Sequence, residues 1–109
     1  GVMVTRAAPD TTRYGSVRTD ATGRITDFEE KQPGAGHING GIYLLRHSVL
    51  ESFPETRPLS LEREVFPNLL NEKNGLRGHP VEAAFLDIGT PETLPQAEAF
   101  VTENQAKFA

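Results

Sequence analysis

The chain has 109 residues, with 11 Lys and Arg against 15 Asp and Glu, which gives a formal net charge of −4 at neutral pH. This acidic balance argues against nucleic acid or an anionic membrane surface as the main partner. The length suits one domain with a core of modest size, and 37% hydrophobic and 24% charged residues are typical of a folded, soluble protein.

The chain has no cysteine, which excludes disulfides and thiolate metal sites and is compatible with a reducing compartment. No apolar run approaches the ~20 residues of a membrane span. The first residues, GVMVTRAAP, lack the charged start and long apolar core of a signal peptide. We therefore expect a cytoplasmic protein. Because an apolar strand begins at once, we also expect the chain to be a fragment of something longer.

The first part of the chain predicts strands. Residues 2–8 form an apolar run that ends at Pro9-Asp10 and leads into a polar loop. Residues 16–19 and 24–28 flank a turn at 20–23 and alternate like the strands of a half-buried hairpin. A further strand is predicted for residues 38–45.

The second part of the chain adds helices, so the pattern as a whole is α/β. A short helix near 47–53 is halted by Pro54, and Ser60 is a good N-cap for a helix over 61–70 that Pro67 should kink or tighten. Asn74-Gly75 should end that helix in the left-handed manner. Two further strands are expected at 76–81 and 83–88, and Thr90-Pro91-Glu92 predicts the start of a last helix running toward Phe108.

The stretch from Phe28 to Leu45 carries the first candidate site. Glu30-Lys31 closes a predicted strand, and Asn39-Gly40-Gly41 opens the next one after a glycine-containing loop. A strand-end Lys and Glu can hold a phosphate and a hydroxyl, and glycines let a ligand approach the backbone closely. The alternative is a hairpin with an exposed ion pair and turn glycines.

Asp87 is the second candidate, because it stands where an apolar run ends and a helix is about to begin. Open α/β sheets bind ligands at the carboxyl ends of their strands, so this position suits a carboxylate that binds a metal or acts as a base. The alternative is an Asp that only caps local backbone groups.

Other polar residues give weaker indications of a functional role. Tyr14-Gly15 could place a ring and a bare backbone against a sugar, or Tyr14 could only cover the hairpin edge. Arg13 could contact a phosphate or only water. The three histidines have no metal-site spacing, and Glu62, Arg63 and Glu64 are interpreted as a solvated helix face.

Taken in order, six pieces of the chain resemble the sugar-phosphate nucleotidyltransferase family. They are Arg13-Tyr14-Gly15, Gly23-Arg24-Ile25, Phe28-x-Glu30-Lys31, Ile38-Asn39-x-Gly41-Ile42-Tyr43, Ser60-Leu61-Glu62-x-Glu64-x-Phe66-Pro67 and Leu86-Asp87-Ile88-Gly89-Thr90-Pro91-Glu92. They are nearest to bacterial enzymes that activate hexose or heptose 1-phosphates, often with GTP. Two local departures from the family pattern are Gly40, where Ala or another small residue is usual, and Gln32, which separates Lys31 from Pro33.

The resemblance covers only the second half of such an enzyme. It implies the C-terminal, sugar-phosphate-binding half of a Rossmann-like nucleotidyltransferase, with a mixed sheet, a β-hairpin and flanking helices. The glycine-rich triphosphate loop and the first metal-binding aspartate of the family have no match here. The substrates implied are a sugar 1-phosphate and a nucleoside triphosphate, the products a nucleotide sugar and pyrophosphate, and the cofactor Mg²⁺.

The resemblance also implies residue roles. Glu30 would accept from sugar hydroxyls, Lys31 would hold the sugar phosphate, and Asp87 would be the second Mg²⁺ carboxylate. Tyr14, Gly15, Asn39, Gly40 and Gly41 would lie against the sugar. With the first half missing, the chain alone should be nearly inactive. We expect a homo-oligomer or self-associating fragment, joined through the strands at 2–8 or 38–45, and a non-catalytic sugar-phosphate-binding or assembly module remains the alternative.

Overall fold

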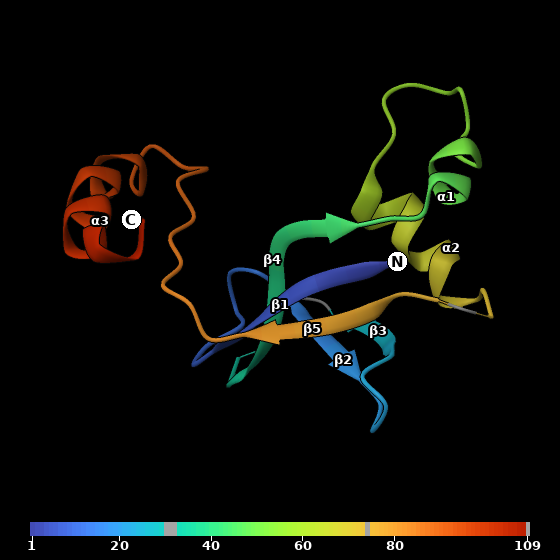
Figure 1. Cartoon of the computed structure of the whole chain (residues 1–109), viewed down its shortest axis with the longest axis horizontal. Coiled ribbons are helices and arrows are strands. Elements are labelled where there is room, and N and C mark those ends of the chain that lie inside the picture. Colours follow the sequence, from blue (N-terminus) through green and yellow to red (C-terminus); the bar gives the residue numbers. More distant parts are fainter. Residues whose placement is uncertain (30–32, 74, 109) are drawn as a thin grey trace.

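The centre of the fold is a three-stranded mixed sheet. The structure is a computed structural model that describes residues 1–29, 33–73 and 75–108. β1 (Val2–Ala8) pairs antiparallel with β4 (Gly36–Leu44) and parallel with β5 (Arg77–Val81), which gives the order β4-β1-β5 (Figure 1). Because β1 has a neighbour on each side, the expectation that copies join through residues 2–8 is wrong. The edges of this sheet belong to β4 and β5.

The predicted hairpin is confirmed as β2 (Ser16–Thr19) and β3 (Ile25–Glu29), which pair antiparallel as a separate two-stranded sheet. The hairpin attaches to the chain around β5 through two backbone bonds. Ile25 N donates to Leu76 O over 2.8 Å, and Gly78 N donates to Gly23 O over 2.9 Å. These bonds hold the hairpin beside the main sheet.

The helix predicted over 61–70 forms, but in two parts. A π-helical turn, η1 (Leu61–Val65), precedes α2 (Phe66–Leu70), and Pro67 lies in the first turn of α2. Proline cannot donate to the carbonyl four residues before it, and its ring crowds that carbonyl, so the preceding turn widens to the longer hydrogen-bond spacing. Pro67 was expected to kink or tighten the helix; the tightening is wrong, because the turn before Pro67 is wider than an α-helical turn. Ser60 is confirmed as the N-cap, since its side chain accepts from Arg63 N.

The predicted helix near 47–53 and the predicted helix end at Asn74-Gly75 agree in part with the structure. The helix near 47–53 appears as α1 (His47–Glu51). Gly75 has φ +44°, as expected after the helix, while Asn74 lies outside the described residues. The Arg24 side chain also caps this helix end, by donating to the carbonyls of Leu70 and Lys73 over 3.1 and 2.7 Å.

The hydrophobic core lies between the sheet, the hairpin and α2. Its largest fully buried side chains are Phe66, Met3, Ile25, Ile38 and Leu76. Phe66 links the core to two strands, because its ring centroid lies 4.9 Å from that of Tyr43 on β4 and 6.2 Å from that of Phe28 on β3. One helix residue thus fixes the spacing between β3 and β4.

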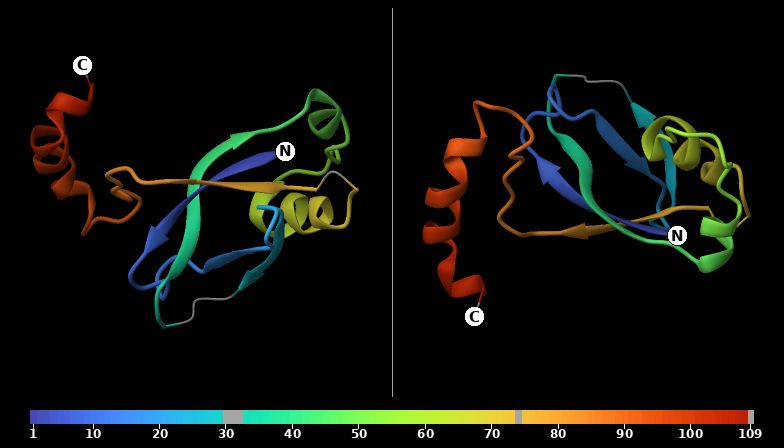
Figure 2. Two further views of the ribbon diagram at one scale, coloured as in Figure 1. Left: turned by 60° about the horizontal axis from the view of Figure 1, so that its bottom comes forward. Right: turned by 90° about the horizontal axis from the view of Figure 1, so that it is seen from above.

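The end of the chain departs most from expectation. No strand forms at 83–88, where a strand was predicted, because the described chain offers this segment no backbone partner. The last helix is confirmed in part: it begins after residues 90–92 and is divided into η2 (Leu94–Gln96), α3 (Ala97–Glu103) and η3 (Gln105–Phe108). Both views in Figure 2 place these helices at one end of the molecule, away from α1 and α2. Among the described residues, no helix is long and apolar enough to cross a membrane.

Candidate functional site

A small pocket of about 120 Å³ lies where the hairpin, β4 and η1 meet. Three of the predicted site residues line it: Tyr14, Gly15 and Asn39. Tyr14 and Gly15 come from the loop before β2, and Asn39 comes from β4, farther along the sequence. The rest of the lining is Ser16, Val17, Phe28, Glu29, Glu62 and Phe66.

Gly15 fits the pocket wall because it has no side chain. Its φ is +69°, a left-handed conformation that favours glycine, and a Cβ there would come within 2.9 Å of the Glu29 carbonyl oxygen. Its N–H donates to Thr11 O over 3.0 Å. The loop can therefore close against β3 only with glycine at this position.

Glu29 is held in place by two neighbours on β2. Arg18 Nε lies 2.8 Å from Glu29 Oε1, and the Ser16 hydroxyl donates to Oε2 over 3.3 Å. Its side chain is 30% exposed. This carboxylate was not predicted as a site residue. Its pairing with Ser16 depends on a register shift between Arg18 and Thr19 that the sequence pattern did not indicate.

Glu30 and Lys31 lie outside the described residues. Glu29, the residue directly before them, lines the pocket.

Asn39 has the densest hydrogen bonding in the site. Its Nδ2 donates to the Tyr43 hydroxyl over 2.7 Å, and its Oδ1 accepts from Gly41 N over 2.8 Å and from the Tyr43 hydroxyl at 3.0 Å. Burial raises the pKa of Tyr43 above its ordinary value, and the nearby Glu62 carboxylate raises it further, against the opposing effect of the Asn39 bond.

The two glycines after Asn39 form a bulge in β4. Thr5 on β1 stands opposite Asn39 and Met3 opposite Tyr43, so β4 has more residues between the two pairs than β1 has. Gly41 has φ +78°, and a Cβ on Gly40 would meet Val4 O at 3.0 Å. Neither glycine lines the pocket, and both are required by this local backbone path.

Arg13 and Asp87 lie outside the pocket lining. Arg13 is exposed, with its guanidinium carbon 5.8 Å from the centre of the Tyr14 ring. Asp87 is half-buried, and its Oδ1 accepts from Gly89 N over 2.8 Å, which is the local capping geometry weighed as its alternative role. Within the described parts of the chain, no group of three or more His, Asp or Glu side chains could hold a metal ion.

Glu62 was interpreted as part of a solvated helix face, and it is exposed, yet it also lines the pocket. Glu64, which lines a different cavity, accepts from Ser60 N over 2.8 Å and so supports the helix start. The pattern of the helix could not distinguish these two glutamates, because the position of Glu62 depends on how η1 lies against β4.

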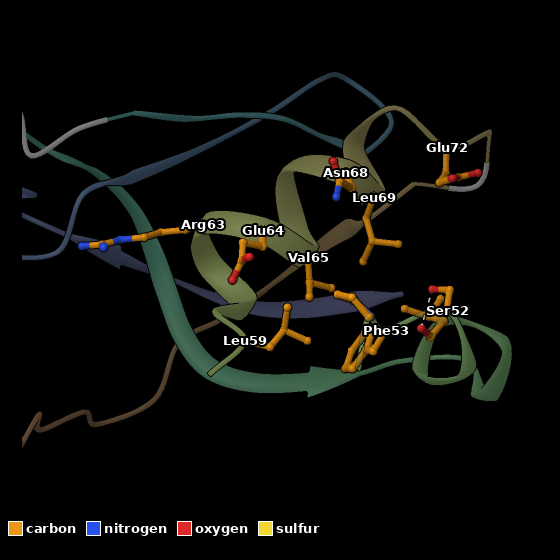
Figure 3. Close-up of a pocket in the computed structure, with 11 residues that line it drawn as sticks. Ser52, Phe53, Leu59, Arg63, Glu64, Val65, Asn68, Leu69 and Glu72 are labelled. Atoms are coloured by element: carbon orange, nitrogen blue, oxygen red, sulfur yellow. Dashed lines mark hydrogen bonds between the residues drawn. The ribbon is translucent and has the colours of Figure 1, made fainter. Parts of the chain in front are cut away.

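A larger groove of about 410 Å³ lies between α1 and the η1–α2 segment (Figure 3). Its apolar side chains Phe53, Leu59, Val65 and Leu69 point toward one another across the groove. None of the predicted site residues lines it. This groove is larger than the pocket at Tyr14, Gly15 and Asn39, but the predicted site residues lie at the smaller pocket.

Comparison with known proteins identifies the family to which the chain is similar. Residues 1–104 match the family model described as nucleotidyl transferase. The chain is 36% identical over 93 residues to the mannose-1-phosphate guanylyltransferase of Mycobacterium tuberculosis, covering 83% of this chain and 26% of that enzyme. It is 40% identical over 93 residues to a probable mannose-1-phosphate guanylyltransferase 2 of Arabidopsis thaliana, covering 83% of this chain and 25% of the plant protein.

Among solved structures, the fold is similar to HddC from Yersinia pseudotuberculosis. The TM-score is 0.73 at 29% sequence identity, covering 91% of this chain and 43% of HddC. HddC complexed with GMP-PN gives a TM-score of 0.71, also at 29% identity and with the same coverage. The chain thus spans about a quarter of the length of the curated relatives. With a family model matching nearly all of its residues, this chain belongs to the nucleotidyl transferase family.

Proposed function

We propose that this chain is the sugar-phosphate-binding half of a sugar-1-phosphate nucleotidyltransferase. In the reaction, a phosphate oxygen of the sugar 1-phosphate attacks the α-phosphorus of a nucleoside triphosphate. The bond from that phosphorus to the pyrophosphate breaks, which gives a nucleotide sugar and pyrophosphate. Mannose 1-phosphate and GTP are the first pair to test, because the similar relatives are named as mannose-1-phosphate guanylyltransferases.

The observation that carries the proposal is the meeting of Tyr14, Gly15 and Asn39 at one pocket with two carboxylates, Glu29 and Glu62. Carboxylates accept hydrogen bonds from hydroxyl groups, an amide both donates and accepts, and an aromatic ring covers the apolar face of a sugar. The two carboxylates of Glu29 and Glu62 disfavour the binding of an anion in this small pocket. The pocket therefore suits the hydroxyl-bearing ring of the substrate better than its phosphate.

The phosphate is assigned to Lys31, with Glu30 accepting from sugar hydroxyls and Arg13 as a further phosphate contact. Gly40 and Gly41 are proposed to lie against the sugar beside Asn39. Lys and Arg neutralise phosphate charge through charge-assisted hydrogen bonds, and transfer of this kind depends mainly on positioning and charge stabilisation.

Asp87 is proposed as a ligand of Mg²⁺. Its Oδ1 accepts from Gly89 N, and among the described residues the other carboxylate oxygen has no hydrogen-bond donor, which leaves that oxygen to a cation. Mg²⁺ in such sites keeps several waters and takes one or two carboxylates together with substrate phosphates, which one aspartate from this chain fits. When bound, the ion would neutralise charge on the phosphates.

A full-length nucleotidyltransferase that carries this segment provides the test. Incubation with Mg²⁺, GTP and mannose 1-phosphate should release pyrophosphate, and omission of the sugar phosphate should abolish the release. A panel of other nucleoside triphosphates and sugar 1-phosphates then ranks the substrates. Absence of pyrophosphate release with every pair, from a protein that is folded by circular dichroism, would contradict the proposal.

A further inference from the structure

The contact between Asn39 and Tyr43 is unusual for two residues on one strand. A regular strand would separate their Cα atoms by about 13 Å, at 3.3 Å per residue. The bulge at Gly40 and Gly41 shortens this path, and the long Tyr43 side chain closes the remaining distance to 2.7 Å between its hydroxyl oxygen and Asn39 Nδ2. The bulge thus brings the Tyr43 hydroxyl into contact with the side-chain amide of Asn39, which lines the pocket.

Gly41 fixes which way the Asn39 amide faces. A backbone N–H can only donate, so the Asn39 atom that meets Gly41 N at 2.8 Å must be the oxygen. The nitrogen then faces the Tyr43 hydroxyl. With one Nδ2 hydrogen engaged by Tyr43 and Oδ1 accepting from both neighbours, Asn39 retains one N–H that has no partner within the described part of the chain.

Tyr43 is itself held firmly. Its ring lies 4.9 Å from the buried Phe66 ring, and Phe66 also lines the pocket floor, whereas Tyr43 does not line the pocket. Tyr43 therefore contacts two residues of the pocket lining, Asn39 through hydrogen bonds and Phe66 through ring packing. A tyrosine hydroxyl is protonated at neutral pH, so Tyr43 can both donate and accept. Burial, against the opposing Asn39 bond, and the nearby Glu62 carboxylate raise the pKa of Tyr43 further.

We propose that Tyr43 is a positioning residue that locks the Asn39 amide, so that Asn39 offers a single N–H donor to a sugar hydroxyl. Glu29 and Glu62, which line the same pocket, provide acceptors for the hydrogen of that hydroxyl. This inference rests on the proposed function for the nature of the ligand. The orientation of Asn39 itself does not depend on it.

The orientation is tested by NMR on the 109-residue chain without ligand. One hydrogen of the Asn39 side-chain NH₂ should exchange slowly with solvent, and the two NH₂ signals should be farther apart than in an unstructured asparagine. Tyr43→Phe keeps the ring but removes the hydroxyl, and should reduce this separation toward the unstructured value and speed exchange. Tyr14→Phe is the matched control, since it removes the other tyrosine hydroxyl and should leave the Asn39 signals unchanged. Unchanged signals in Tyr43→Phe would overturn the inference.

The effect on recognition is tested in the full-length enzyme by a double-mutant cycle. Tyr43→Phe should raise KM for the sugar 1-phosphate about three- to tenfold, the range for one neutral hydrogen bond, with kcat nearly unchanged. In an Asn39→Ala background, Tyr43→Phe should have no further effect. An equal effect in both backgrounds would mean that Tyr43 acts by supporting the fold, which contradicts the inference. An enzyme that uses no sugar phosphate would refute the proposed function, while the NMR result would still decide the orientation.

Discussion

Arg6 on β1 reaches Phe85 and thereby ties the segment that leads to Asp87 to the central sheet. Its guanidinium carbon lies 5.4 Å from the centre of the Phe85 ring, and its Nε donates to Ala83 O over 3.0 Å. Phe85 in turn meets Tyr14 edge-on, with 6.4 Å between ring centroids. The candidate metal ligand and the pocket lined by Tyr14 are therefore connected through Phe85.

Arg6→Ala should loosen this segment without unfolding the protein. Both contacts are near the surface, so the loss should be about 1 kcal/mol. Amide exchange at 85–89 should speed up while the melting temperature changes little. Arg57→Ala is a suitable control, because Arg57 donates to the carbonyls of its own loop at Pro54 and Thr56. If 85–89 exchange equally fast in both variants, Arg6 does not anchor the segment.

Asp87→Asn separates the two roles considered for this side chain. Asn keeps an oxygen that can accept from Gly89 N, so the melting temperature should change little. In the full-length enzyme kcat should fall by orders of magnitude, since the charge that helps hold Mg²⁺ is gone. Near-normal kcat at saturating Mg²⁺ would leave Asp87 only its capping role.

Lys31→Ala should act on substrate binding. Removal of a charge-assisted contact to the sugar phosphate costs about 1.5–3 kcal/mol, or roughly 10- to 150-fold in KM. Steady-state kinetics with mannose 1-phosphate as the varied substrate measure the change. Lys73→Ala, in the turn after α2 and outside the pocket lining, is the matched control. A KM equal to that of the unmodified enzyme would remove the phosphate role from Lys31.

The stability of the hairpin turn should depend on pH through Asp20. Bonds from the Thr22 hydroxyl and backbone N–H lower the pKa of Asp20 from its ordinary value. Because the folded pKa is depressed, the stabilisation is present above the pKa of the unfolded chain and is lost as pH falls through the lower folded value. NMR titration of the Asp20 carboxyl should show a midpoint below the usual value for aspartate. A midpoint at or above that value would contradict the turn geometry.

Self-association is predicted through β4, because β1 has no free edge. Ile42 and Leu44 on β4 are 64% and 75% exposed, which is high for such side chains at a sheet edge. Sedimentation should show a dimer or larger species at micromolar concentration. Leu44→Lys should shift the chain to monomer, whereas Leu94→Lys, at an equally apolar site on η2, should not. A monomer before any substitution would exclude this interface.

Local sequence patterns predicted the hairpin, the Ser60 cap and the strand at 2–8, because each depends on neighbouring residues. Residues 83–88 were predicted wrongly for the converse reason, since an apolar run makes a strand only where another strand pairs with it. The same limit applies to the site. Resemblance to the family indicated Tyr14, Gly15 and Asn39, but Glu62 and Tyr43 gain their relation to the pocket from the bulge in β4 and from how η1 lies against that strand.

The central claim, that this pocket is the sugar site, is tested most directly by titrating isotopically labelled 109-residue chain with mannose 1-phosphate. Amide and side-chain signals of Gly15, Ser16 and Asn39 should shift together and saturate in the millimolar range or below, while those of Phe53 and Leu69 in the larger groove stay in place. Shifts confined to that groove, or no saturable shifts at all, would contradict the account.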